Sequence, residues 1–266
     1  MKRFIKGIGL ALCLTSFSIF ALGSGSDSNS STEKIEVDAT NSGSDSSNSS
    51  GTSSNSSEKK EMKYEITDSK FEYYTNSIGS VEYFGIVEIT NTGDTYIYLD
   101  TCTFDLEDND GHLLQSDSYI NTAPSVVAPG EKGYYYNGIG NGLIGEGVSL
   151  DNGVKLVPQL KISEAKKVPT EYPVSDVTTR EGDFGYINVV GRVENTSDKD
   201  ISYLYISIIF YDENGKVLDV ESTGISDIAA GNKGSFDTTC FWSNDNVKFT
   251  DIAETKVYAR ELYINW

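Results

Sequence analysis

The acidic segment 107–111 is the part of the chain that comes nearest to a metal-binding motif. Its sequence, Glu-Asp-Asn-Asp-Gly, places hard oxygen ligands just before a glycine, as in loops that bind calcium. An EF-hand loop also needs an oxygen ligand five residues before that glycine, and this chain has Leu106 there. We therefore interpret the segment as an acidic hairpin turn and predict no metal ligand; a weak calcium site of another type is the alternative.

His112 is the only histidine, so a Ser–His–Asp or Cys–His nucleophile system would have to use it. Nothing around it resembles a nucleophile motif, and we expect it to be exposed to solvent. A pair of carboxylates for glycosidic cleavage cannot be selected by spacing from 40 acidic residues. The sequence thus predicts no catalytic residue and a protein that is not an enzyme.

Residues 140–145 match the pattern G-x-G-x-x-G of dinucleotide-binding folds. That motif needs a strand before it and an amphipathic helix after it, so that the helix N-terminus meets the pyrophosphate. Residues 146–153 have no helical apolar stripe. We interpret the segment as a flexible glycine loop and predict no cofactor-binding residue and no cofactor.

Composition excludes further classes. The 266 residues include 21 Lys and Arg against 40 Asp and Glu, a formal net charge of −19. Nucleic-acid binding needs a basic surface, so no nucleic-acid partner is expected. One His and three Cys leave zinc fingers and iron–sulfur clusters almost without ligands.

Residues 1–23 are predicted to be a secretory signal peptide. Lys2, Arg3 and Lys6 precede an apolar run over 8–22, and Ala21 and Gly23 are the small residues that signal peptidase needs at positions −3 and −1. The alternative is a permanent transmembrane anchor, but the run is shorter than the ~20 residues that span a membrane. We predict a secreted, extracellular protein, with association to the cell surface as a variant of this location.

Residues 21–26 resemble a bacterial lipobox, in which a cysteine after the small residue carries lipid. Ser24 occupies that position and has no thiol to acylate. Membrane association is therefore expected only through an uncleaved signal peptide. A lipid anchor would be the other route, but Ser24 cannot carry one. The Ser-rich segment 24–62 has too few apolar residues to offset the entropy of ordering, so we predict a disordered linker.

An internal repeat organises the rest of the chain. Segment 84–92 parallels 188–196, and at the same offset segment 104–111 parallels 208–215. A third block, 128–135, parallels 229–236 three residues out of step. The blocks predict a duplicated unit of about 100 residues, with a first domain over 63–166 and a second over 167–266.

Each copy is predicted to be all-β. Leu204, Ile206, Ile208 and Phe210 alternate with Tyr203, Tyr205, Ser207, Ile209 and Tyr211, a period of two that is typical of a strand with one face on a core. Asn214-Gly215 then supplies a hairpin turn. The fold class predicted is two tandem immunoglobulin-like β-sandwich domains after a disordered N-terminal segment, with an up-and-down or Greek-key barrel as the alternative. Cys102 falls on a core position, so we predict that it forms no disulfide with Cys240 in the other copy.

Tyrosines are the candidate ligand-binding residues. The repeat matches Tyr135 to Phe236 and places it in the core, so Tyr134 and Tyr136 should point outward. Tyr203, Tyr205 and Tyr211 should do so in the second copy, and Tyr203 and Tyr205 are the ligand-binding candidates there. Exposed rings offer flat apolar faces with a polar tip, which suits an extracellular glycan or a protein partner. The alternative is the ordinary preference of Tyr for strands.

The repeated blocks resemble the FxLYD domain of bacterial secreted proteins and lipoproteins. Segment 104–108, Phe-Asp-Leu-Glu-Asp, matches the motif except for Glu107, and segment 208–212, Ile-Ile-Phe-Tyr-Asp, keeps its Tyr and Asp. The resemblance covers about 64–162 and 174–264. It implies an immunoglobulin-like extracellular module without an established catalytic residue.

We therefore expect a secreted or cell-surface, non-catalytic binding or display protein whose ligand is unknown. The alternatives are an extracellular hydrolase, which would need a concave pocket with convergent acids, and a purely structural surface spacer.

Overall fold

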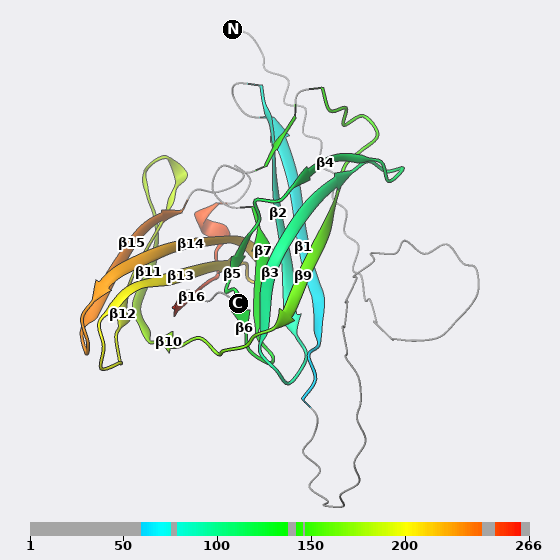
Figure 1. Cartoon of the computed structure of the whole chain (residues 1–266). Coiled ribbons are helices and arrows are strands. Elements are labelled where there is room, and N and C mark those ends of the chain that lie inside the picture. The colour runs from blue at the N-terminus through cyan, green and yellow to red at the C-terminus, as the bar shows by residue number, and fades with distance from the viewer. Residues whose placement is uncertain (1–59, 76–78, 138–141, 146, 241–247, 262–266) are drawn as a thin grey trace, which may run out of the picture. The chain divides into compact units, whose positions relative to one another are not determined.

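The computed structural model describes residues 60–75, 79–137, 142–145, 147–240 and 248–261 (Figure 1). The predicted signal peptide and nearly all of the predicted linker lie outside these residues. The described chain is all-β with antiparallel sheets, as predicted, and no α-helix occurs in it; its helical elements are the short 3-10 turns η1 (Asp183–Gly185) and η2 (Phe249–Asp251). Within this part of the chain, no helix meets the length and hydropathy that crossing a membrane would require.

The N-terminal half, residues 60–166, contains two sheets. Sheet I has the order β1-β2-β7-β5, with β8 also paired to β2; sheet II has the order β4-β3-β6, with β9 also paired to β3. The bounds are β1 (Tyr64–Thr75), β2 (Val81–Asn91), β3 (Ile97–Glu107), β4 (Leu113–Asp117), β5 (Asn121–Ala123), β6 (Val126–Val127), β7 (Lys132–Tyr136), β8 (Gly142–Ile144) and β9 (Lys155–Glu164).

The C-terminal half, residues 167–261, also contains two sheets. Sheet III has the order β11-β12-β15, and sheet IV the order β10-β16-β13-β14. The bounds are β10 (Glu171–Tyr172), β11 (Val174–Glu181), β12 (Ile187–Glu194), β13 (Ile201–Tyr211), β14 (Val217–Ile228), β15 (Lys233–Cys240) and β16 (Glu254–Arg260).

Alternation along the strands builds one core inside each half. In β13 the predicted inward row of Leu204, Ile206, Ile208 and Phe210 is buried in a cluster with residues of β12 and β15. In β3 the row of Cys102, Phe104 and Leu106 is buried in a cluster with residues of sheet I. Cys102 and Cys240 are both buried and free, as predicted, each in the core of its own half.

The two halves share a strand order. The order β1-β2-β7 of sheet I corresponds to β11-β12-β15 of sheet III, and β3 lies between β9 and β4 as β13 lies between β16 and β14. These are the equivalences that the repeated blocks predict.

A buried asparagine makes the same contacts in both halves. The Nδ2 of Asn91 donates to the carbonyls of Thr95 and Val127 at 2.8 and 2.9 Å. The Nδ2 of Asn195 donates to the carbonyls of Lys199 and Ile228 at the same two distances. Both asparagines are fully buried, and each one fixes the turn after its strand to a strand segment of the facing sheet.

A third apolar cluster joins the two described halves, which belong to one compact unit. We call it the junction. It combines the outer face of sheet I with the outer face of sheet IV, because alternate residues of β2, β7 and β13 point away from the two inner cores. Its buried members are Phe84, Ile86, Ala123, Tyr134, Tyr136, Ile209, Tyr211, Val217 and Val220.

Polar contacts cross the junction. The hydroxyls of Tyr134 and Tyr211 lie 2.7 Å apart, and the hydroxyl of Tyr136 donates to Ser222 Oγ at 3.1 Å. Lys70 Nζ donates to the carbonyl of Leu218 at 2.9 Å. The junction therefore satisfies the polar tips of its tyrosines while it buries their rings.

Burial at the junction overturns the predicted exposure of Tyr134 and Tyr136. Both point away from the core that holds Tyr135, as predicted, but each is only 1% exposed because sheet IV covers them. Burial is the main cause that raises the pKa of both phenols. Neither ring can meet a ligand in this arrangement. The predicted exposure of Tyr211 is wrong for the same reason, because sheet I covers it and leaves it only 5% exposed.

Replacing Tyr134 or Tyr136 with Ala should each lower the free energy of unfolding by about 3 kcal/mol or more, because a buried aromatic ring leaves a cavity. Tyr134→Phe should cost about 1 kcal/mol, since it removes only the hydroxyl between the halves. Denaturant titration measures these losses. Tyr119→Ala, at a residue 90% exposed, is the control and should change stability by less than about 0.5 kcal/mol. Equal stability of the Tyr134→Ala variant and the wild type would contradict the burial.

Candidate functional site

Tyr203 and Tyr205 form an exposed aromatic pair on the outer face of sheet IV. They are 46% and 42% exposed, as the sequence predicts. Their ring centroids lie 5.1 Å apart with an interplanar angle of 75°, an edge-to-face arrangement that favours both rings. The same face of β13 continues into Ile209 and Tyr211, which sheet I covers. The pair is thus the part of this face that the junction leaves open.

The two tyrosine rings lie next to small residues of the neighbouring strand β14. Tyr203 lies opposite Ser226, and Tyr205 lies opposite Gly224. A Cβ at position 224 would collide with the Tyr203 ring, so glycine allows the ring to lie close to the sheet. The resulting surface has two aromatic rings next to exposed backbone and hydroxyl groups, a combination that can stack on a flat apolar face and hydrogen-bond at its edges.

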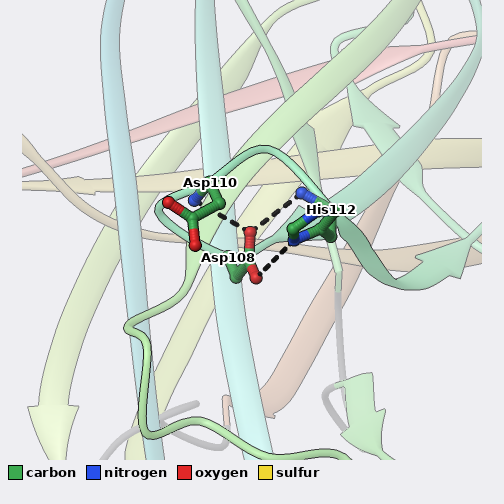
Figure 2. A group of neighbouring side chains, drawn as sticks. All are labelled: Asp108, Asp110 and His112. Carbon is green, nitrogen blue, oxygen red and sulfur yellow. Dashed lines mark hydrogen bonds and ion pairs between the residues drawn. The ribbon is translucent and has the colours of Figure 1, made fainter.

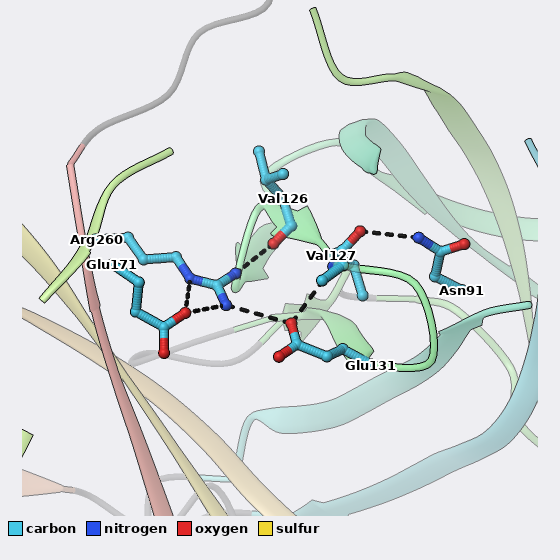
Figure 3. A network of polar contacts seen from close by, with 7 residues as sticks. Asn91, Val126, Val127, Glu131, Glu171 and Arg260 are labelled. Carbon is cyan, nitrogen blue, oxygen red and sulfur yellow. Dashed lines mark hydrogen bonds and ion pairs between the residues drawn. The ribbon is translucent and has the colours of Figure 1, made fainter. Parts of the chain in front are cut away.

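Arg260 lies beside the pair, directly opposite Tyr205 in the register of β13 and β16. Figure 3 shows its polar contacts with Glu171, Glu131 and Val126. Its Nε donates to Glu171 Oε2 at 2.9 Å, and its Nη2 lies 3.3 Å from Glu131 Oε2. Its Nη1 donates to the carbonyl of Val126 in the N-terminal half. Arg260 therefore ties both halves together at the edge of the aromatic pair, a role that the sequence analysis missed.

Buried charge at the junction includes Glu88, which is 3% exposed. Its Oε1 accepts from Thr67 Oγ1 at 2.7 Å and from Lys132 Nζ at 2.8 Å, and its Oε2 accepts from the Tyr134 hydroxyl at 3.2 Å. The carboxylate is thus paired and hydrogen-bonded, which is what a buried charge requires. These contacts stabilise the junction and leave no oxygen directed at solvent for chemistry.

The acidic turn gathers Asp108, Asp110 and His112, whose ligand atoms lie within 4.8 Å of one another (Figure 2). Asp108 Oδ1 accepts the backbone N–H groups of Asp110 and His112 at 2.9 and 2.8 Å. Its Oδ2 lies 3.0 Å from His112 Nδ1, and Asn152 Nδ2 donates to it at 3.3 Å. The hydrogen bonds from the His112 backbone and side chain hold the pKa of Asp108 well below its usual range.

The corresponding turn of the second copy reproduces this geometry without a histidine. Asp212 Oδ1 accepts the N–H groups of Asn214 and Lys216, both at 2.8 Å. Asp108 and Asp212 each also bond backbone to backbone across the hairpin, to the carbonyls of His112 and Lys216. The aspartate therefore closes a hairpin turn in both halves, as predicted for segment 107–111. The first turn has the ligand types of a cation site, but its geometry is already explained by the turn.

His112 is exposed, as expected, with 76% of its side chain accessible. Its hydrogen bond to Asp108 raises the pKa of its imidazole. No serine or cysteine side chain is hydrogen-bonded to it among the described residues. Its position next to the turn glycine matches the interpretation of a solvated turn residue.

A pair of buried carboxylates lies in the C-terminal half. Asp219 and Glu221 are 1% and 5% exposed, and they oppose Phe210 and Ile208 on the core face of sheet IV. Burial, with the charge of Asp219 as a second cause, raises the pKa of Glu221 to about 9. Burial, followed by the charges of these two acids, also raises the pKa of the Cys240 thiol. The thiol is therefore poorly suited to act as a nucleophile at neutral pH.

Stability should depend on pH through Glu221. The folded protein keeps a proton on Glu221 up to about pH 9, whereas the unfolded chain releases it near 4.5. The raised pKa of Glu221 stabilises the folded protein fully below pH 4.5, and this contribution is lost as pH rises through about 9. The free energy of unfolding should therefore fall between these two pH values.

Glu221→Gln should flatten this decline and should be more stable than the wild type at about pH 8, because its amide stays neutral. Thermal unfolding at several pH values measures the effect. Glu213→Gln, at an exposed residue of the same hairpin, is the matched control. Parallel pH profiles for Glu221→Gln and the wild type would show that Glu221 does not titrate as described.

A hollow of about 320 Å³ opens between β11 and β16. Its lining has apolar and threonine side chains and no ionisable group, and Thr179 Oγ1 bonds Thr255 Oγ1 at 2.8 Å. It therefore lacks the convergent acids that the hydrolase alternative requires. The lining residues are Val177, Thr179, Phe249, Ile252, Ala253 and Thr255.

The glycine segment 140–145 is only partly described. Gly142–Ile144 form β8 and pair with β2, so this part is a strand and not the flexible loop expected. A Cβ at position 142 would collide with the ring of Tyr83, so close packing against this ring accounts for the glycine at that position. Residues 138–141 and 146 lie outside the described residues.

No family model and no curated protein matches this chain.

Proposed function

We propose that the protein is a secreted or cell-surface, non-catalytic binding protein built from two immunoglobulin-like β-sandwich modules related to the FxLYD domain. The modules are the predicted domains 63–166 and 167–266. They act as one body because the junction and Arg260 hold them together. The ligand surface is the aromatic pair Tyr203 and Tyr205.

Duplication is supported by contacts that random similarity would not reproduce. Asn91 and Asn195 make matching pairs of hydrogen bonds, and Asp108 and Asp212 close their hairpins in the same way. The residues concerned lie in the repeated blocks that resemble the FxLYD domain. These contacts hold the fold together and supply no catalytic group. The function of the protein therefore has to be inferred from a site on its surface.

The single observation that carries the binding proposal is the exposure of Tyr203 and Tyr205. Tyr211 of the same strand face is buried at the junction, whereas these two residues keep their rings exposed, with Gly224 opposite Tyr205. Large rings in a fixed arrangement lose little conformational entropy on binding, which makes them efficient contact residues. An extracellular glycan or a protein with an exposed apolar face fits this surface.

The net charge of the protein limits which ligands the tyrosine pair can bind. The chain has a formal net charge of −19, so it repels anionic lipids and anionic wall polymers at long range. Arg260 adds no free positive charge next to the tyrosines, because Glu131 and Glu171 are paired with it. We therefore expect a neutral ligand rather than an anionic polymer.

Replacing both Tyr203 and Tyr205 with Ala should weaken ligand capture at least about tenfold, since stacked aromatic contacts dominate such surfaces. The measurement is binding to an array of glycans, wall polymers and extracellular proteins, followed by titration of the ligands found. Tyr119→Ala, at another strongly exposed tyrosine, is the control and should bind like the wild type. Undiminished capture by the double variant would move the site elsewhere, and no capture by the wild type would favour a structural spacer.

A further inference from the structure

Strand β15 forms an open edge of sheet III. Among the described strands it pairs with β12 alone, whereas its counterpart β7 pairs with β2 on one side and β5 on the other. The difference arises because β14 stays in sheet IV over its whole length, while the N-terminal half sends β5 across to sheet I. Among the described residues, the edge that β5 fills in one half has no paired strand in the other.

The other long edge strands of the described chain are irregular. Register shifts interrupt the pairing of β1 with β2, of β9 with β3, of β11 with β12 and of β14 with β13. Bulges of this kind twist an edge and hinder pairing with another chain. By contrast, β15 pairs with β12 over Lys233–Cys240 without any shift. A regular eight-residue edge is a ready template for a further strand.

Charges on β15 are self-complementary. Phe236 and Cys240 face the core, while Lys233, Ser235 and Asp237 are exposed on the opposite face. A second β15 placed antiparallel about a two-fold axis at Ser235 sets each Lys233 opposite the Asp237 of the other copy. Opposite charges directly across an antiparallel pair are favourable, and like charges are not.

Other registers lose this match. An axis at Lys233 would bring two lysines together, and an axis at Asp237 would bring two aspartates together. The charges thus disfavour these two registers, and axes at Gly234 or Phe236 lose the pairing of Lys233 with Asp237. Ion pairs within sheet III continue this alternation of charge away from the edge: Glu194 lies 3.2 Å from Lys233, and Arg180 lies 3.6 Å from Asp237.

We propose that the protein dimerises through β15, which pairs antiparallel with β15 of a second copy about a two-fold axis at Ser235. The contact joins the two copies of sheet III into one continuous sheet. It is isologous, so it closes on itself and gives a dimer rather than a fibre. The interface is narrow and polar, so the dimer is weak and its population depends on concentration.

Sedimentation velocity of residues 24–266, the chain expected after removal of the signal peptide, tests the proposal. A dimer should appear as the concentration rises to about 0.5 mM, a range chosen for a small interface. Lys233→Glu and Asp237→Lys should each abolish it, because each places like charges across the pair. The double variant restores the opposite charges and should restore the dimer. A wild type that stays monomeric, or single variants that dimerise like the wild type, would overturn the proposal.

A cross-link tests the register itself. Ser235→Cys places two thiols across the two-fold axis, so mild oxidation should yield a covalent dimer. The native Cys102 and Cys240 are buried and should not contribute. Thr239→Cys, exposed on the same face of the strand but away from the axis, is the matched control and should stay monomeric. Equal cross-linking of both variants would reject this register.

Discussion

The outer face of sheet I is the constraint on which the arrangement depends. Strand β2 is buried without interruption from Tyr83 to Ile89, so both of its faces need apolar cover. Sheet II covers the inner face, and sheet IV supplies the cover for the outer one. Burial of two tyrosines and a phenylalanine there is worth several kcal/mol by transfer energies alone. The direct Arg260 and Tyr134 contacts between the halves are possible only once these faces meet.

Local features of the fold were predictable because they depend on neighbouring residues. Alternation in β13 assigned Leu204 and Phe210 to the core, and Asn214-Gly215 predicted the hairpin that follows. The turn interpretation of segment 107–111 held for the same reason, since an aspartate two residues before a turn can bond the backbone whatever surrounds it. The duplicated blocks also put Asn91 and Asn195 at equivalent positions, and the structure shows that they make equivalent hydrogen bonds, which the sequence analysis did not predict.

What covers a face was not predictable from alternation. The period-2 pattern places Tyr134 and Tyr136 on one face and Tyr203 and Tyr205 on another, but it cannot say that sheet IV buries the first pair. A signal was present in the continuous apolar runs 83–87 and 208–211, because a strand that is apolar on both sides is covered on both sides. Arg260 gave no such signal, since its partners come from distant segments of the chain.

Two copies of one pattern present different surfaces because their outer faces and edges differ. The N-terminal half uses the outer face of sheet I at the junction and fills the edge of β7 with β5. The C-terminal half uses sheet IV instead, so it keeps the outer face and the β15 edge of sheet III free of the junction. At the end of sheet IV beyond the junction, the same asymmetry leaves Tyr203 and Tyr205 exposed. Because the inner cores are equivalent, divergence of the outer faces and edges alone is sufficient to separate a scaffold half from a half that carries the proposed contact surfaces.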